Sequence, residues 1–219
     1  EQYLNVALDA VLHPMPSEVR QATQRHQHAA VVAPPVPERQ LTAQEYFEQA
    51  AIAPDPAERT QLYDRAIGLD PNFSPAFNNR GLLRHKKGDL AGARADYDTA
   101  IGLDPNNAMA HNNRGMLRAW QGDLAGALTD IDTAIRLDPH SATAFNNRGQ
   151  LRLGQGDVAG AWADYDAAIR LDPGFGQALN NRGVLRERQG DTSAALADYD
   201  TAIRLDPKDA VTLHNWGVP

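Results

Sequence analysis

Apolar residues recur at spacings of three and four along most of this chain, a period that predicts amphipathic α-helices. The segment from 90 to 103 shows the pattern clearly, because its apolar residues fall on one stripe of a helix. These residues are Leu90, Ala93, Tyr97, Ala100, Ile101 and Leu103. A Gly-Asp pair comes just before this segment and Leu-Asp-Pro closes it, so both ends of the predicted helix carry a stop signal.

The whole pattern returns every 34 residues, and the tetrapeptide Asn-Asn-Arg-Gly returns with it. The four near-copies occupy residues 74–107, 108–141, 142–175 and 176–209. A degenerate copy precedes them at 40–73, and a partial copy follows at 210–219. Self-similarity at a fixed period indicates a stack of one supersecondary unit, in which each unit buries its apolar stripe against its neighbours.

Each copy is predicted to contain two antiparallel helices of about 14 residues. Gly88 supplies the left-handed helix end between them, and Asp89 caps the second helix. Pro105 ends that second helix, because proline cannot continue it. Gly81 lies inside the first helix, where we expect it to permit a close crossing opposite Ala93. Thr42 and Glu45 form a capping box at the start of the degenerate copy.

These residues resemble a bacterial-type array of the tetratricopeptide repeat (TPR) family, with Gly at position 8, Gly-Asp at 15 and 16, Ala at 20 and 27, and Pro at 32. An aromatic residue at position 24 completes the match in most copies. The resemblance covers 40–209 and implies an all-α fold, a right-handed α-solenoid of stacked antiparallel helix pairs. One departure stands out, because the family usually has apolar or aromatic residues at positions 7 and 11, where every full copy here has Arg.

The arginines at positions 7 and 11 share a helix face, and the second helix of each full copy carries Asp-x-Asp. We interpret the two signs, which recur in equal number, as an internal Arg-to-Asp ladder between helices of adjacent repeats. An anion-binding row of arginines or a metal-binding Asp pair is the alternative. The two carboxylates of Asp-x-Asp point about 200° apart on a helix, which makes them poor joint metal ligands.

The resemblance also implies that the first helices line a concave surface on which members of this family hold their ligands. Positions 5 and 6 of every full copy are Asn, whose amide both donates and accepts hydrogen bonds and so suits the backbone of an extended peptide. With three neighbouring side chains, the predicted peptide-binding residues are Asn78, Asn112, Asn146, Asn180, Asn79, Asn113, Asn147, Asn181, Met116, Trp120 and Gln150. We expect position 5 to be the better ligand row. The alternative is that one Asn per repeat bonds a neighbouring helix and sets the repeat geometry.

Two functions remain compatible with these observations. The first is a non-catalytic protein-protein interaction module that binds an extended peptide in the concave groove. The second is a structural or assembly subunit held through its helix faces and its two ends. The family's clamp for chaperone tails needs Lys at position 5 and Asn at position 9, and because this chain has neither we do not predict chaperone binding.

Composition narrows the classes further. A net charge of -7 argues against nucleic acid as a partner, and the absence of cysteine excludes thiolate metal sites and cysteine nucleophiles. No catalytic arrangement, cofactor site or metal site is recognisable, so we expect a protein that is not an enzyme. No apolar run reaches the roughly 18 to 20 residues of a membrane span.

The two ends of the chain do not fit the repeat. Residues 1–39 are predicted to form an N-terminal arm with short helices and a Pro-rich linker, VVAPPVPERQ. Residues 210–219 are the start of a sixth unit or cap, and we expect either a shortened array or self-association through this end. A start at Glu1 without Met fits a processed secretory protein or a piece of a longer one. With the absence of cysteine, that start favours the periplasm or secretion over the cytoplasm.

Overall fold

A computed structural model of the chain describes residues 41–208 together with 212, 215 and 217. The chain divides into two units, Glu1–Gln40 and Leu41–Pro219, and every described residue belongs to the second. The predicted N-terminal arm lies outside the described residues. So does most of the partial copy at 210–219, and with it the predicted self-associating end.

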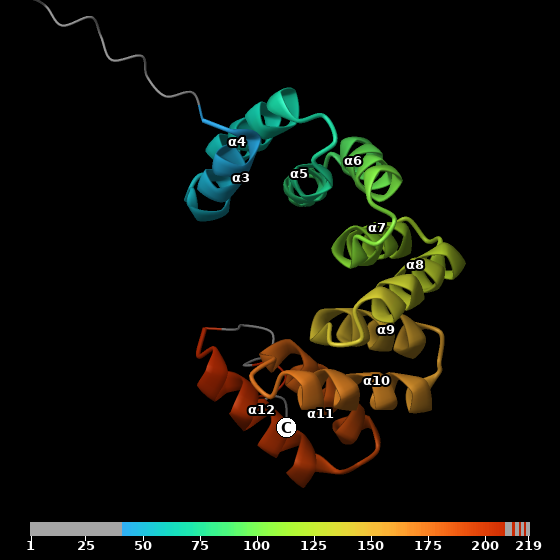
Figure 1. Cartoon of the computed structure of the whole chain (residues 1–219). Helices are drawn as coiled ribbons and strands as arrows, with labels where there is room; N and C mark the ends of the chain where they lie inside the picture. The colour runs from blue at the N-terminus through green and yellow to red at the C-terminus, as the bar shows by residue number, and fades with distance from the viewer. Residues whose placement is uncertain (1–40, 209–211, 213–214, 216, 218–219) are drawn as a thin grey trace, which may run out of the picture. The chain divides into compact units, whose positions relative to one another are not determined.

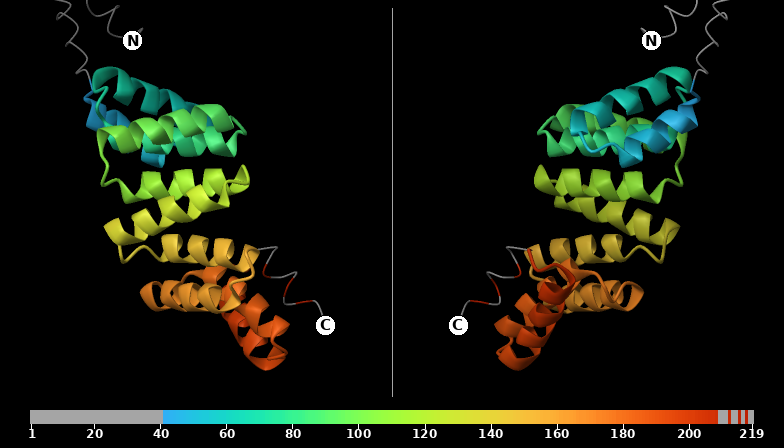
Figure 2. Two further views of the ribbon diagram at one scale, coloured as in Figure 1. Left: turned by 90° about the vertical axis from the view of Figure 1, so that its right-hand side faces the viewer. Right: turned by 90° about the vertical axis from the view of Figure 1, so that its left-hand side faces the viewer.

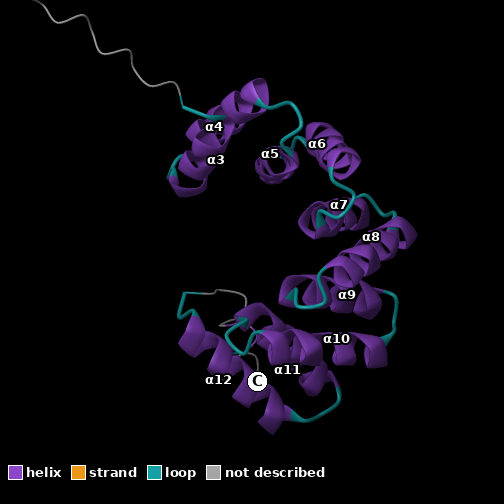
Figure 3. Cartoon of the chain, in the orientation of Figure 1, coloured by secondary structure: helices purple, strands orange, loops and turns teal. Residues whose placement is uncertain are grey.

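Ten α-helices and no strand occur in the described residues (Figure 3). The first helix of each pair is α3 (Ala43–Ile52), α5 (Ser74–Lys86), α7 (Ala108–Trp120), α9 (Ala142–Gly154) or α11 (Gly176–Arg188). The second is α4 (Pro56–Leu69), α6 (Leu90–Leu103), α8 (Leu124–Leu137), α10 (Val158–Leu171) or α12 (Thr192–Leu205). In the part of the chain that the structure describes, no helix is both long enough and apolar enough to cross a membrane.

The turn inside each pair has the geometry that the Gly-Asp sequence predicts. Gly88 has φ +84°, in the left-handed region, and its three equivalents have φ between +83° and +86°. Asp89 then caps α6, because its Oδ1 accepts a hydrogen bond from the Gly92 amide at 2.9 Å. The predicted capping box of α3 is confirmed as well, with Thr42 and Glu45 each bonding the backbone of the other.

Within Leu41–Pro219 the pairs stack in chain order, as Figures 1 and 2 show. Each first helix packs on its own second helix, and each second helix packs on the first helix of the next pair. Successive first helices from α5 to α11 also contact one another, and Figure 1 shows α5, α7 and α9 on the inner side of the curve. The predicted all-α solenoid of helix pairs is confirmed, and it places one row of helices on a common face.

The close crossing at Gly81 involves a different neighbour from the one that the sequence suggested. A Cβ placed on Gly81 would lie 2.8 Å from Cε1 of Tyr97 and 3.2 Å from Cβ of Asp96, and the expected partner Ala93 is not among its three nearest neighbours. Tyr97 is fully buried, and it packs with Ala93 and with Leu117 of the next pair. The glycine therefore makes room for an aromatic ring that joins two pairs.

Candidate peptide-binding groove

Arg80 connects its own helix pair to the preceding one. Its Nε and Nη2 donate to the Asp96 carboxylate at 3.0 and 2.6 Å, while Nη1 donates to Asp64 of the preceding pair at 2.7 Å. Arg84 adds a third contact, 2.9 Å from the same Asp96. Asp96 is only 3% exposed, so this carboxylate is buried but fully compensated by two guanidinium groups. The hydrogen bond to Asp96 raises the pKa of Arg80, although burial lowers it.

The same arrangement recurs in every full repeat, and we call it the Arg-Asp ladder. Its position-7 arginines each bond the first Asp of their own Asp-x-Asp and the second Asp of the preceding pair; they are Arg80, Arg114, Arg148 and Arg182. The predicted ladder is confirmed, and it occupies the arginines that an anion would need. In the described residues no three His, Asp or Glu side chains gather as a metal site.

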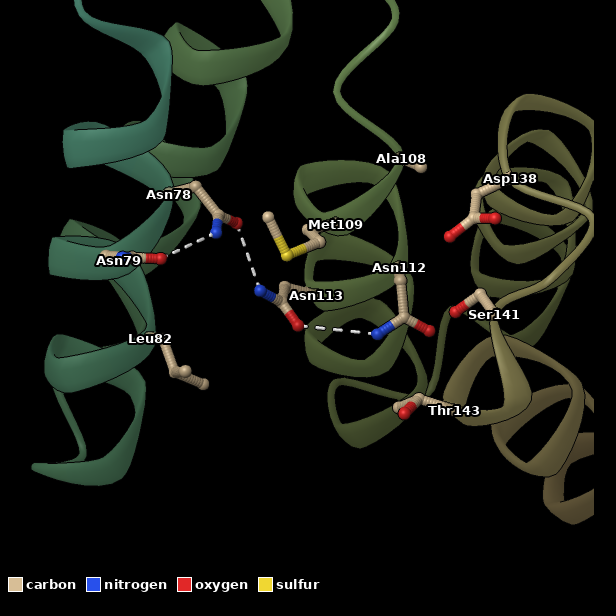
Figure 4. A pocket seen from close by; sticks show the side chains of 10 residues that line it. All are labelled: Asn78, Asn79, Leu82, Ala108, Met109, Asn112, Asn113, Asp138, Ser141 and Thr143. Carbon is tan, nitrogen blue, oxygen red and sulfur yellow. Dashed lines mark hydrogen bonds between the residues drawn. The ribbon is translucent and has the colours of Figure 1, made fainter. Parts of the chain in front are cut away.

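The two Asn rows form a second connection between repeats, which we call the Asn ladder. In each step the Nδ2 of a position-6 Asn donates to the Oδ1 of the position-5 Asn one repeat earlier. The four steps are Asn113 to Asn78 at 3.0 Å, and Asn147 to Asn112, Asn181 to Asn146 and Asn215 to Asn180 at 2.9 Å. Figure 4 shows the first step, between α5 and α7.

The Asn ladder buries position 5 more deeply than position 6. Asn78, Asn146 and Asn180 are 1%, 0% and 5% exposed, and only Asn112 in this row is half-buried. In the other row Asn79, Asn113 and Asn181 are half-buried. The amides therefore set the spacing of the repeats, as the alternative interpretation of the sequence held, and position 6 has more surface left for a ligand than position 5.

Two adjoining cavities open among the first helices. The smaller has a volume of about 340 Å³ and the larger about 540 Å³. They share Leu82, Asn112, Asn113 and Thr143 as lining residues. The smaller cavity, drawn in Figure 4, has Asn78, Asn79 and the thioether of Met109 on one side and Asp138 with Ser141 on the other. Amide groups and apolar side chains thus alternate along its wall.

The structure brings together some of the predicted site residues and leaves others apart. Five of the eight asparagines line these cavities, namely Asn78, Asn79, Asn112, Asn113 and Asn147, and so does Met116. Asn146, Asn180, Asn181, Gln150 and Trp120 line neither cavity. Trp120 is nevertheless 70% exposed at the end of α7.

Sequence analysis did not place three of the lining residues in the site. Leu82 and Met109 stand at positions 9 and 2 of the repeat, both in the set that the family resemblance assigns to the concave surface, so a signal for them existed. Tyr97 stands on a second helix at position 24, where the pattern indicates only a core aromatic residue. Its place at the larger cavity depends on how two pairs meet.

Stacked helix pairs with a shared inner row of first helices define this protein as an α-solenoid. A family model for the tetratricopeptide repeat matches residues 112–174 and 146–210, and one for the TPR repeat matches 81–122. Together these matches run from 81 to 210, more than half of the chain. This chain therefore belongs to the tetratricopeptide repeat family. None of the curated proteins matches it.

Solved structures with a similar fold include TTC0263, a thermophilic TPR protein of Thermus thermophilus, with 19% identity, 80% of this chain and 97% of that chain covered, and a TM-score of 0.69. YrrB, described as a TPR protein with an unusual peptide-binding site, has 22% identity, coverage of 80% and 92%, and a TM-score of 0.55. MamA 41-end from Desulfovibrio magneticus RS-1 has 19% identity, coverage of 77% and 97%, and a TM-score of 0.58. At these identities the likeness establishes the fold. TPR solenoids generally serve protein-protein interaction without catalysis.

Proposed function

We propose that this chain is a non-catalytic interaction module that holds an extended segment of a partner protein against α5, α7 and α9. The supporting observation is the pair of adjoining cavities on the first helices, which expose apolar side chains between amide groups. Cavities of this size, lined by apolar groups with a few polar ones, are the usual form of a binding site. YrrB, which shares the fold, is described as having an unusual peptide-binding site.

Helix α7 supplies the apolar part of this surface. Met109, Met116 and Trp120 lie seven and four residues apart, so they form one stripe along the helix. Met109 is 63% exposed and Trp120 is 70% exposed, which is unusual for side chains of this size in a described core. Methionine adapts to different partner side chains, and tryptophan is enriched among residues that dominate binding energy.

The amides can still bond a peptide after the Asn ladder has formed. An Asn side chain has two N–H donors and two acceptor lone pairs. Asn113 uses one donor on Asn78 and one acceptor on Asn112, so one of each is left. Because position 6 is the more exposed row, we propose that Asn113 and Asn147, rather than the buried Asn78 and Asn146, contact the backbone of the peptide.

A charge placed in the middle of the groove tests this proposal. We would select peptides from a displayed random library on the full chain and measure their affinities by fluorescence anisotropy. Met116→Lys should weaken the selected peptides about tenfold or more, because it puts an ammonium group where an apolar side chain is bound. Leu171→Lys is the matched control, since Leu171 is 37% exposed on the second helix α10. Equal affinities for the two variants would count against the groove.

The alternative function is a structural subunit of a larger assembly. Both ladders favour it to the extent that they commit polar side chains of the first helices to contacts between repeats. In that case Met116→Lys would leave capture of the natural partner intact, whereas a change on an outer helix face would abolish it. Self-association through the C-terminal end stays a prediction, which sedimentation velocity at increasing concentration would test.

A further inference from the structure

The hydroxyl of Tyr97 has no hydrogen-bond partner in the described part of the protein. The side chain is 0% exposed, and its burial, with a smaller effect of the Asp96 charge, raises the pKa of Tyr97. The hydroxyl therefore keeps its proton at neutral pH and remains a donor. Buried hydroxyls normally find a partner, so a donor without one is a place where a ligand group or a water is expected.

Other repeats of the same chain show where this hydroxyl points. The equivalent Tyr63 hydroxyl accepts a hydrogen bond from Asn79 Nδ2 at 3.2 Å, and the equivalent Tyr199 hydroxyl donates to Glu187 Oε2 at 3.1 Å. Asn79 stands at position 6 of the next repeat, and Glu187 at position 12 of the same repeat. A tyrosine at position 24 thus reaches the first-helix face between two pairs.

At Tyr97 those two places are held by Asn113 and His85, and all three residues line the larger cavity. Asn113 directs its amide N–H to Asn78 at 3.0 Å, so it does not donate to the tyrosine as Asn79 does. No carboxylate stands at position 12 to accept from the hydroxyl, as Glu187 does in the last repeat. The donor of Tyr97 is left beside an open cavity.

The charge around this cavity selects the chemistry of the missing acceptor. Lys86 lines the larger cavity, and no Asp or Glu does so among the described residues. The smaller cavity has the opposite character, with Asp138 and no cation. On a chain whose net charge is -7, the larger cavity is a local place that favours a negative group.

We infer that the larger cavity is a subsite for the side-chain carboxylate of an Asp or Glu in the bound peptide. The Tyr97 hydroxyl donates to this carboxylate and the Lys86 ammonium pairs with it, a charge-assisted arrangement stronger than a neutral one. Apolar neighbours of the acidic residue lie against Leu82 and Met116, which line the same cavity. The inference rests on the proposed function and adds the recognition element, an acidic residue flanked by apolar ones.

The test uses the full chain and a displayed library of random 12-residue peptides. Selected peptides are then made with both ends blocked, each in an acidic form and in a form with Glu→Gln or Asp→Asn, and their affinities are measured. The protein variants are Tyr97→Phe and Lys86→Met. Tyr199→Phe and Lys87→Met are matched controls, because Tyr199 bonds Glu187 and Lys87 bonds Thr60, and neither lines a cavity named above.

We expect selection of one acidic position between apolar ones, and about a tenfold loss when its acid becomes an amide. Tyr97→Phe should bind the acidic peptide about tenfold more weakly and largely lose the preference for acid over amide. Lys86→Met should cost about threefold, as for an exposed pair. Both controls should bind as the original chain does. Tyr97→Phe removes only an unpaired hydroxyl, and thermal unfolding by circular dichroism verifies that it folds.

Three results would overturn parts of this account, and they can be told apart. Selected peptides without an acidic position, or an acid preference that Tyr97→Phe leaves unchanged, overturn the subsite but not the groove. Peptides that bind only through a free C-terminal carboxylate overturn the assignment to a side chain. A library that yields no binder on the original chain overturns the proposed function itself.

Discussion

The guanidinium of Arg114 lies 2.8 Å from a carboxylate oxygen of Asp98, a residue of the preceding helix pair. The same group donates to Asp130 of its own pair at 2.9 and 2.7 Å. One side chain therefore holds three helices together, α6, α7 and α8. Because Asp130 is 3% exposed, its charge depends on this contact and on Arg118 for compensation.

Arg114→Met should lower the free energy of unfolding by about 3 kcal/mol, since it leaves a buried carboxylate short of one of its two cations. Urea denaturation followed by circular dichroism measures this loss. Arg94→Met is the matched control, because Arg94 is 54% exposed and only 3.8 Å from Asp98 in an i,i+4 pair. Such an exposed pair contributes at most about 0.5 kcal/mol. Similar losses in the two variants would contradict the role of the Arg-Asp ladder.

Asn113→Ala should lower the free energy of unfolding by about 1 to 2 kcal/mol, because it leaves the buried Asn78 carbonyl oxygen without its donor. The measurement is the same denaturation experiment, with binding of a selected peptide recorded in parallel. Asn106→Ala serves as the control, since Asn106 is an exposed residue of the loop between α6 and α7. A change there should stay within about 0.5 kcal/mol. An unaffected Asn113→Ala would show that the Asn ladder does not support the fold.

Gly149→Ala and Gly102→Ala should have opposite effects on the melting temperature. A Cβ on Gly149 would lie 2.7 Å from Cε1 of Tyr165, so the ring must shift and stability falls by about 1 to 3 kcal/mol. Gly102 lies in α6 with nothing within 4 Å of an added Cβ. There the better helix propensity of Ala should raise stability by about 0.5 to 1 kcal/mol. Differential scanning calorimetry decides the signs, and a stabilising Gly149→Ala would refute the tight crossing.

Tyr165 predicts a loss of stability at high pH. Burial and then the charge of Asp164 raise the pKa of Tyr165 to about 12, although Arg188 lowers it. Below pH 10 the unfolded tyrosine is also protonated, so this contribution to stability is fully present there. Between pH 10 and about 12 the unfolded chain releases a proton that the folded chain keeps, and stability falls by up to about 1.4 kcal/mol per pH unit.

Denaturation of the original chain and of Tyr165→Phe at pH 8, 10 and 11 tests this expectation. The two should differ little in slope below pH 10, and Tyr165→Phe should lose less stability between pH 10 and 11. Ultraviolet difference spectra at each pH report tyrosine ionisation directly. Parallel losses in both proteins would mean that Tyr165 does not titrate as proposed.

The helix pairs and their turns could be predicted from the sequence because they depend on residues close together in the chain. Gly88 adopts a left-handed φ and Asp89 caps α6 through interactions that span at most a few residues. The pairing of Arg with Asp could be inferred too, because two opposite charges recurring at one period have few other stable arrangements. These expectations needed no knowledge of how one pair is rotated against the next.

The candidate site depended on that rotation. Asn78 and Asn113 both belong to Asn-Asn-Arg-Gly, and the tetrapeptide does not indicate that one accepts from the other across a repeat boundary. The sequence favoured position 5 as the ligand row, yet stacking buries Asn78 and leaves Asn113 half-buried. Tyr97 looks the same as Tyr63 in the pattern, but only Tyr63 finds a partner for its hydroxyl.

The sequence alone thus determined the repeat, its two helices, the turns and the charged pairs, since the period of 34 residues and local backbone preferences are enough for each of them. The tertiary structure decided which amides are used between repeats, where the cavities open and which hydroxyl is left unpaired. Those properties depend on distances of a few ångströms between side chains from different helix pairs. A residue's type and its place in the repeat do not specify such distances.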